Sequence, residues 1–297
     1  MVNLLACAPC CWGVESSDNP HNPNWMTVLS ESRLAGFVGL ELGPYGFLPL
    51  DADTVNTALY LKELEVCAGT IFEPLSELEM RTEILEKTER LCALLQEIGT
   101  SKLVVIDCVN DIRSHYAGIS EQAPRLDDQR WGVMMNTIKM ISDIAAKYQV
   151  RAVVHPHAGG YIEYQDELDR MLKDIPAECA GLCLDTGHLY YAGMDPAQSL
   201  IEYSDRLEYV HFKDVNQAKL ASAIQRKVGF WQACAEGVMC PIGEGAVNYE
   251  QVSQALEAIG YKGWITIEQE RDPRHCETTF PDIKKSREYL LDHGFAL

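Results

Sequence analysis

The stretch VVHPHAGGYIE, residues 153–163, carries side chains that can bind a metal or move a proton. His155 and His157 stand one residue apart after an apolar run, and Glu163 follows a pair of glycines. Imidazole is a common metal ligand, and it also serves as an acid or a base because its pKa lies near neutral pH. This stretch alone therefore fits a metal site, a proton-transfer site or simple packing, and the other segments must discriminate among them.

Three further segments end apolar runs with carboxylates or imidazoles. An oxygen-rich set of ligands with one or two imidazoles suits Mn²⁺, Co²⁺, Mg²⁺ or Zn²⁺. Taken singly, Asp185 could cap a helix, His211 could be a core histidine and Glu268 could pair with a nearby arginine. All three together favour a metal site. The segments are CLDTGH (Cys183–His188), VHFKD (Val210–Asp214) and ITIEQE (Ile265–Glu270).

The elements that must position these side chains alternate short β-rich runs with longer amphipathic runs, as in parallel sheets with crossover helices. Eight such units in 297 residues predict an α/β fold, a single (β/α)8 TIM barrel over residues 1–297. Residues 217–236 are expected to form an extra helix after the seventh strand, a possible lid. The expected strands are 3–9, 37–42, 65–71, 102–108, 151–156, 180–185, 208–212 and 264–268, and the clearest helices are 75–99, 130–148, 164–175 and 248–260.

In such a barrel, chemistry collects at the carboxyl ends of the strands. The side chains expected there come from the first, second, fourth and all later strands. They are Trp12, Glu41, Asp107, His155 with His157, Asp185 with His188, His211 with Lys213, and Glu268 with Glu270.

Composition limits the possible partners. The net charge of −19 disfavours nucleic acid, because a strongly acidic protein repels phosphate backbones. The sequence has no run of 18 apolar residues that would cross a bilayer, and the apolar start MVNLLACAPCCW reads as a first strand. Eleven cysteines, most of them in apolar segments, fit the reducing cytoplasm better than a disulfide framework. Cys7, Cys10 and Cys11 are expected to pack at a strand end beside a pocket.

At this point the chain resembles a known family. DTGH, HFKD, the GEG of IGEGAVNY (Ile242–Tyr249) and the final IEQE are similar in type and order to motifs of the xylose-isomerase-like TIM-barrel superfamily. Within it, ACAPCCWG, GLELGPYGFLP (Gly39–Pro49) and VVHPHAGGYIEYQDELD look most like the inosose dehydratases. The resemblance spans nearly the whole chain.

The resemblance implies a divalent metal held by Glu, Asp, His and Glu from strands five to eight. Asp185, His211 and Glu268 match the last three places, but strand five ends in His155 instead of Glu. Either His155 is a ligand itself, or the flexible AGG turn folds Glu163 back toward the metal. We favour Glu163, because it restores the number of carboxylates.

The resemblance further implies a metal-dependent dehydratase, a lyase of inositol catabolism that acts on a keto-inositol or related keto-sugar. In this reading Mn²⁺ or Co²⁺ acts as a Lewis acid, with Mg²⁺ and Zn²⁺ as alternatives. His155 is the expected base, His157 binds a substrate hydroxyl or acts as the acid, and Lys213 contacts a substrate oxygen. The expected substrate-binding residues are Trp12 as an apolar wall, Glu41 as a hydroxyl acceptor, His188 and Glu270.

Two other functions stay open. An epimerase or isomerase of keto-polyols commonly uses a glutamate on each face of the substrate, and the changed strand-five position weakens that reading. The other open function is a barrel that binds polyols without turnover. Endonuclease chemistry is disfavoured, because the additional histidines of its three-metal cluster are missing. The expected partner is a small polyol or keto-sugar, and the protein is a possible homo-oligomer in the cytoplasm.

Overall fold

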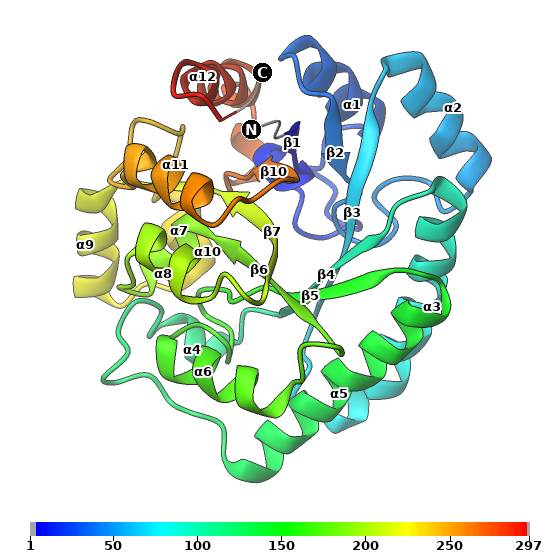
Figure 1. The fold of residues 1–297 in the computed structure, drawn as a ribbon. Coiled ribbons are helices and arrows are strands. Elements are labelled where there is room, and N and C mark those ends of the chain that lie inside the picture. The colour runs from blue at the N-terminus through cyan, green and yellow to red at the C-terminus, as the bar shows by residue number, and fades with distance from the viewer. Residues whose placement is uncertain (1–3, 296–297) are drawn as a thin grey trace.

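A computed structural model describes residues 4–295, and its eight parallel strands close into a barrel in the order β1-β10-β7-β6-β5-β4-β3-β2 (Figure 1). Each strand overlaps one of the eight predicted from the sequence, so the predicted TIM barrel is confirmed. The strands are β1 (Leu4–Cys7), β2 (Gly39–Glu41), β3 (Glu65–Glu73), β4 (Lys102–Asp107), β5 (Arg151–Val154), β6 (Gly181–Asp185), β7 (Leu207–Phe212) and β10 (Trp264–Ile267).

Helices surround the barrel, and their ends follow local capping chemistry. Asp51 accepts a hydrogen bond from the Thr54 amide at the start of α2, and Gly99 ends α3 with a φ of 90°. The four clearest predicted helices correspond to α3, α5, α6 and α11. The outer helices are α1 (Trp25–Leu34), α2 (Ala52–Lys62), α3 (Arg81–Ile98), α5 (Asp128–Lys147), α6 (Gln165–Asp174), α8 (Pro196–Glu202), α11 (Tyr249–Ala258) and α12 (Thr279–Asp292).

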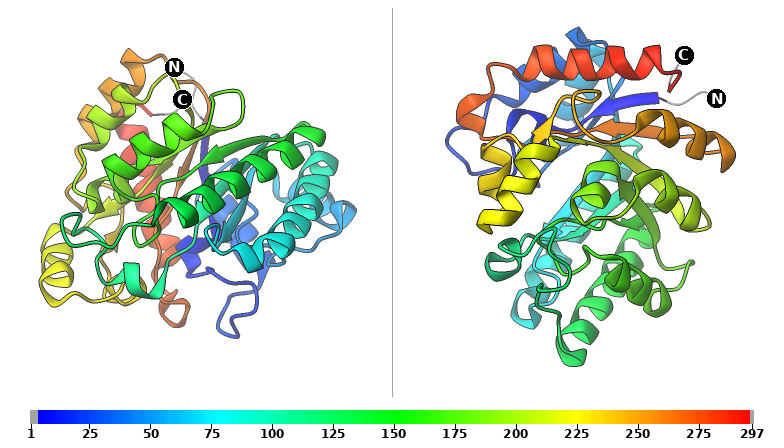
Figure 2. Two further views of the ribbon diagram at one scale, coloured as in Figure 1. Left: turned by 90° about the horizontal axis from the view of Figure 1, so that it is seen from below. Right: turned by 90° about the vertical axis from the view of Figure 1, so that its left-hand side faces the viewer.

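Short elements line the loops that follow the strands. Residues 217–236, expected to hold one extra helix, contain the two helices α9 and α10. Both lie at the end of the barrel opposite the two chain ends (Figure 2, right, yellow). The short elements are η1 (Pro9–Trp12), η2 (Leu78–Met80), α4 (Asp111–Ser114), α7 (Thr186–Tyr191), β8 (Asp214–Val215), α9 (Gln217–Arg226), α10 (Phe230–Ala235), β9 (Met239–Cys240) and η3 (Pro273–His275).

Alternation along the strands separates two cores, because successive side chains of a strand point to opposite faces. Most large apolar residues form a core between the barrel and its helices. A smaller core includes Ala6, Cys67, Val104, Val153, Cys183 and Tyr209, which alternate with members of the first. This smaller core fills the barrel interior and forms the floor of the site described below. None of the helices among residues 4–295 has the length and apolarity to span a bilayer.

Candidate metal and proton-transfer site

The candidate site continues the inward-facing rows of three strands. Asp185 lies two residues after Cys183 and His211 lies two residues after Tyr209, so both side chains point into the barrel. Asp185 and His211 are register partners on β6 and β7, and His211 pairs with Thr266 on β10. Glu268, two residues after Thr266, completes this row. Strand register therefore brings the three expected ligands together.

The fourth member of this cluster is His155, which lies two residues after the inward-facing Val153. One ligand atom from each of His155, Asp185, His211 and Glu268 lies within 4.8 Å of the others. His155 Nε2 is 3.7 Å from Asp185 Oδ2, and His211 Nδ1 is 2.9 Å from Glu268 Oε2. We call these four residues the four-residue cluster.

Several atoms of the cluster lack conventional partners. Both ring nitrogens of His155, Asp185 Oδ2 and His211 Nδ1 are buried without a hydrogen-bond partner among residues 4–295. Buried polar atoms without a hydrogen bond are costly, and here they converge on one point, where their contacts are ion pairs with Lys213 and among themselves. Two imidazoles and two carboxylates are ligands that Mn²⁺, Co²⁺ and Zn²⁺ accept, so the donor set fits a divalent metal.

Asp185 has two roles at once. Its Oδ1 accepts hydrogen bonds from the amides of Gly187 and His188, at 2.8 and 2.9 Å, and so caps α7. The helix cap considered from the sequence is real, but it occupies only one carboxylate oxygen. Burial opposes the charged form, yet the Lys213 ammonium and His188 hold the pKa of Asp185 well below its usual range. The second oxygen is therefore a charged group aimed into the cluster.

Lys213 joins the cluster to a second carboxylate. Its Nζ lies 2.5 Å from Glu270 Oε1, 2.9 Å from Glu268 Oε2 and 3.3 Å from Asp185 Oδ2. Burial favours a neutral amine, but these three carboxylates raise the pKa of Lys213 well above its usual value. Lys213 is thus a buried ammonium. Its carboxylate partners are these three groups, and the next residue, Asp214, instead accepts hydrogen bonds from four backbone amides.

His188 and Glu270 lie beside this ammonium. His188 Nε2 is 2.9 Å from Lys213 Nζ, and its Nδ1 accepts a hydrogen bond from the Ala158 amide at 3.1 Å. His157, His188 and Glu270 also have atoms close enough to share an ion. Lys213 Nζ contacts His188 and Glu270, so the Lys213 ammonium already supplies a positive charge where such an ion would lie.

His157 has a proton arrangement suited to a base. Its Nδ1 lies 2.9 Å from the Ala158 carbonyl oxygen, which can only accept, so Nδ1 carries the proton and Nε2 the lone pair. Burial, together with His188 and His155, lowers the pKa of His157 well below its usual value. His157 is therefore a neutral imidazole, and it lines the pocket beside the cluster.

The structure does not bring Glu163 to the four-residue cluster. Its carboxylate accepts hydrogen bonds from the amides of Gly118 and Gly159, at 2.8 and 2.9 Å, and lies 3.7 Å from Arg113 Nε. The AGG turn thus holds Glu163 away from the four-residue cluster and uses it to tie two loops together. His155, which we expected to be the base, is the residue that lies beside Asp185, His211 and Glu268.

Two residues of the expected substrate-binding set have different surroundings from those predicted. Trp12 is 1% exposed, and its Nε1 donates to Glu31 Oε2 at 2.6 Å, so it packs in the protein core instead of forming an apolar wall of the pocket. Glu41 does line the pocket, but its Oε1 is 2.8 Å from His211 Nε2. Cys10 also lines the pocket, as expected for strand-end packing.

Glu15 is a site residue that the sequence reading missed. It lines the same pocket, and its Oε1 is buried with no hydrogen-bond partner within the described chain. Burial and the carboxylate of Glu270 raise the pKa of Glu15 well above its usual value, although Lys213 acts in the opposite direction. Glu15 follows η1, where no strand periodicity or motif points to it.

The pocket around these groups is small. Its walls combine apolar side chains, such as Val14, Phe72 and Ile106, with the polar groups described above. The space open to the centres of water molecules is about 60 Å³. Because one water needs about 10–15 Å³ of such space, the pocket has room for a few waters.

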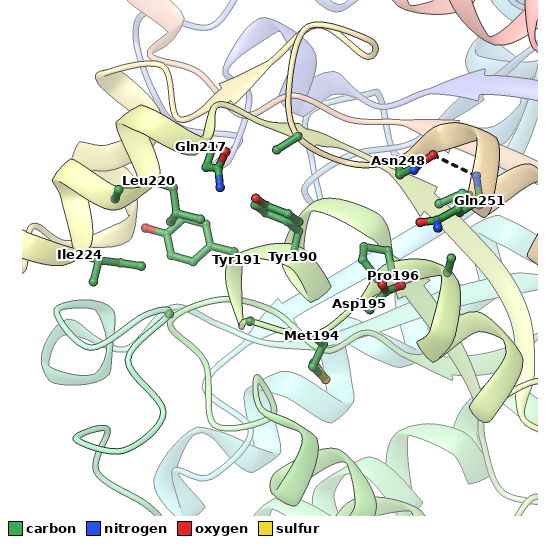
Figure 3. A pocket seen from close by; sticks show the side chains of 16 residues that line it. Tyr190, Tyr191, Met194, Asp195, Pro196, Gln217, Leu220, Ile224, Asn248 and Gln251 are labelled. Carbon is green, nitrogen blue, oxygen red and sulfur yellow. Dashed lines mark hydrogen bonds between the residues drawn. The ribbon is translucent and has the colours of Figure 1, made fainter.

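A larger hollow lies elsewhere. This groove of about 610 Å³ runs between α7, α9 and α11, and its labelled side chains include Tyr190, Gln217 and Gln251 (Figure 3). It lacks the clustered carboxylates and imidazoles of the smaller pocket. The larger hollow therefore lacks the reactive groups that the smaller pocket holds, and we take the smaller pocket as the candidate site.

Known proteins resemble this chain along its length. Inosose dehydratase of Geobacillus thermodenitrificans is 30% identical over 292 residues, which cover 97% of this chain and 96% of that protein. Inosose dehydratase of Lactiplantibacillus plantarum is 32% identical over 251 residues, covering 84% and 82%. The predicted resemblance is thereby confirmed.

Solved structures share the fold. The probable 3-DHS dehydratase AsbF of Bacillus anthracis has a TM-score of 0.71 at 16% identity and covers 98% of this chain and 99% of its own. The IOLI protein with a bound zinc atom has a TM-score of 0.72 at 16% identity, covering 98% and 97%. The model of the xylose isomerase-like TIM barrel family matches residues 30–293. The chain therefore belongs to the xylose isomerase-like TIM barrel family.

Proposed function

We propose that this protein is a divalent-metal-dependent dehydratase that removes water from a keto-inositol or a related keto-sugar. The observation that carries the proposal is the convergence of unpartnered buried ligand atoms in the four-residue cluster, among residues 4–295, beside a neutral His157. The similarity to inosose dehydratases over nearly the whole chain supports the substrate class.

His155, Asp185, His211 and Glu268 would hold the metal. Mn²⁺ or Co²⁺ is the proposed ion, because the site combines two carboxylates with two imidazoles and both ions accept oxygen and nitrogen ligands. When bound, the ion would supply a Lewis acid for the ketone oxygen and make the neighbouring C–H more acidic.

His157 acts as the base in this proposal, since its Nε2 carries a lone pair and its Nδ1 proton is committed to the Ala158 carbonyl. It takes the proton from the carbon beside the ketone. Lys213, a buried ammonium, donates a hydrogen bond to the negative oxygen that develops. Glu15 is the acid: its raised pKa lets it keep a proton for the departing β-hydroxyl. The hydroxyl leaves as water, and a conjugated ketone remains.

The helices of residues 217–236 act as the lid in this proposal. Phe230 lies 5.1 Å from the ring of His157, and Trp231 lies 6.2 Å from the ring of Phe72 at the pocket wall. Exclusion of water by these aromatic rings would protect the charged intermediate.

The test is an incubation with 2-keto-myo-inositol and Mn²⁺ or Co²⁺ in D₂O, followed by ultraviolet absorbance and NMR. We expect a conjugated product that forms only with metal. Deuterium exchange without loss of water would favour the epimerase instead. Binding without either reaction, across a panel of keto-sugars, would contradict the dehydratase and leave a polyol-binding barrel.

We further infer a cytoplasmic enzyme of inositol catabolism whose partner is this small substrate. Growth on inositol of a strain lacking the protein tests the pathway, and sedimentation of the purified protein tests whether it forms the homo-oligomer considered from the sequence.

A further inference from the structure

Glu41 on β2 is bonded to a residue of the four-residue cluster. Its Oε1 lies 2.8 Å from His211 Nε2, and it also accepts a hydrogen bond from the Tyr209 hydroxyl at 2.7 Å. All three side chains are at least 98% buried. This contact crosses the barrel from β2 to β7, so it joins parts of the chain that lie 170 residues apart.

The contact decides which nitrogen of His211 carries a proton. A carboxylate lies near each ring nitrogen, but only Nε2 makes a hydrogen bond, since Nδ1 has no hydrogen-bond partner among residues 4–295. A carboxylate only accepts, so Nε2 is the donor to Glu41. A neutral His211 imidazole therefore carries its lone pair on Nδ1. Nδ1 is the nitrogen that faces Glu268 and Asp185, at 2.9 and 3.9 Å. Glu41 thus selects the tautomer in which the free nitrogen faces the four-residue cluster.

The Tyr209 hydroxyl holds the Glu41 carboxylate in place through a hydrogen bond. Because Tyr209 and His211 are two residues apart on β7, they point into the barrel on the same row. The Tyr209 hydroxyl lies 2.5 Å from Thr266 Oγ1 and 3.3 Å from Cys67 Sγ. Since the single phenolic proton goes to Glu41, Thr266 serves as donor to Tyr209. Tyr209 and His211 thus both donate to Glu41 Oε1.

We infer that Glu41, held in place by Tyr209, is a positioning residue that fixes the tautomer and ring orientation of His211 and thereby sets the affinity of the site for a divalent cation. The inference rests on the metal site of the proposed function, and it reassigns Glu41 from the substrate to the support of a ligand. Partners of this kind change metal affinity by about 10–100-fold when they are lost.

The test compares Glu41→Gln and Tyr209→Phe with the wild type after removal of metal. Titration with Co²⁺ or Mn²⁺ by calorimetry gives the affinity, and the absorption spectrum of bound Co²⁺ reports ligand geometry. We expect Glu41→Gln to weaken binding by about 10–100-fold and to alter the spectrum. Tyr209→Phe should weaken binding less, because it leaves the Glu41 carboxylate present.

Glu208→Gln is the matched control. It is the same substitution on β7, the strand of Tyr209 and His211, but Glu208 pairs with Arg151 and Lys102, each at 2.7 Å, outside the four-residue cluster. It should lower stability toward urea while Co²⁺ affinity and the Co²⁺ spectrum stay at wild-type values. A purely structural role for Glu41 would give the same pattern as this control.

Imidazole ¹⁵N NMR of the Zn²⁺-loaded wild type tests the tautomer directly. We expect the proton of His211 on Nε2, and a proton on Nδ1 would overturn the inference. Unchanged Co²⁺ affinity in Glu41→Gln would also overturn it while leaving the dehydratase intact. Conversely, a wild type that binds Co²⁺ but dehydrates no keto-sugar would contradict the proposed function and leave the role of Glu41 standing. A wild type that binds no divalent cation would contradict both.

Discussion

Asp185 and His211 are register partners on β6 and β7, with Asp185 Oδ2 3.9 Å from His211 Nδ1. Asp185 holds the first turn of α7 with one oxygen and faces His211 with the other. The same carboxylate therefore fixes the local backbone and contributes to the four-residue cluster. The role of Asp185 as a helix cap therefore does not exclude a role in the chemistry of the site.

The first prediction concerns the fourth ligand. His155→Ala should reduce metal affinity by at least about 100-fold, because loss of a ligand exceeds the ~10–100-fold cost of losing an outer partner. Glu163→Gln should keep the metal, since its carboxylate is bonded to the Gly118 and Gly159 amides. Elemental analysis after gel filtration measures both. Metal loss in Glu163→Gln with metal retention in His155→Ala would contradict the cluster.

The second prediction separates base from acid. His157→Gln should abolish both deuterium exchange and dehydration, each falling by about 10²–10⁴-fold. Glu15→Gln should retain exchange but lose dehydration by a similar factor, because the proton for the departing hydroxyl is missing. NMR in D₂O follows both reactions in one sample. Equal loss of the two reactions in Glu15→Gln would argue against its role as the acid.

The third prediction is a pH dependence of stability. Burial raises the pKa of Glu163 to about 7 against an ordinary 4.5, although Arg113 and two backbone amides act in the opposite direction. Because the folded-state pKa is the higher one, the contribution of Glu163 is fully present below pH 4.5. It is lost as the pH rises through about 7.

Urea unfolding of the metal-free protein between pH 4.5 and 8 measures this effect. Over that range, the free energy of unfolding of the wild type should fall relative to Glu163→Gln by up to about 3 kcal/mol. Relative to Asp107→Asn, the free energy of unfolding of the wild type should also fall as the pH rises, since burial raises the pKa of Asp107 to about 7. Parallel pH profiles for the wild type and both variants would refute the prediction.

The fourth prediction tests the reassignment of Trp12. Trp12→Phe should lower the free energy of unfolding by about 1–3 kcal/mol, because it removes the hydrogen bond to Glu31 and leaves a small cavity. KM should stay unchanged. Steady-state kinetics and urea unfolding check both parts, and a several-fold rise in KM would restore Trp12 to the substrate pocket.

The fifth prediction concerns the proposed lid. Trp231 is 37% exposed and contacts the rings of Phe72 and His157. Trp231→Ala should raise KM several-fold and lower the free energy of unfolding by about 2–4 kcal/mol, because a ring that is 37% exposed still buries roughly 150 Å². Trp25→Ala offers a control, since Trp25 lies on α1. Similar kinetics in the two variants would speak against a lid.

The sequence by itself determined the barrel and most of its site. Eight apolar runs separated by amphipathic segments specify eight strands and crossover helices, because strand and helix periodicities are local properties. Carboxylates and imidazoles at the strand ends then identify Asp185, His211 and Glu268, since the fold gathers those ends at one face. Lys213 and Glu270 followed from the same local pattern.

The tertiary structure decided the rest. His155 lies two residues after the inward-facing Val153, so strand alternation points its side chain into the barrel. We favoured Glu163 as the fourth ligand because it restored the number of carboxylates, and that argument did not use the strand register. Glu163 is fixed by Gly118 from another loop, and Trp12 by Glu31 of another helix. Glu15 and the bond between Glu41 and His211 depend likewise on side chains distant in sequence. Such contacts form only when the barrel closes, because closure brings β2 and β7 to the same interior.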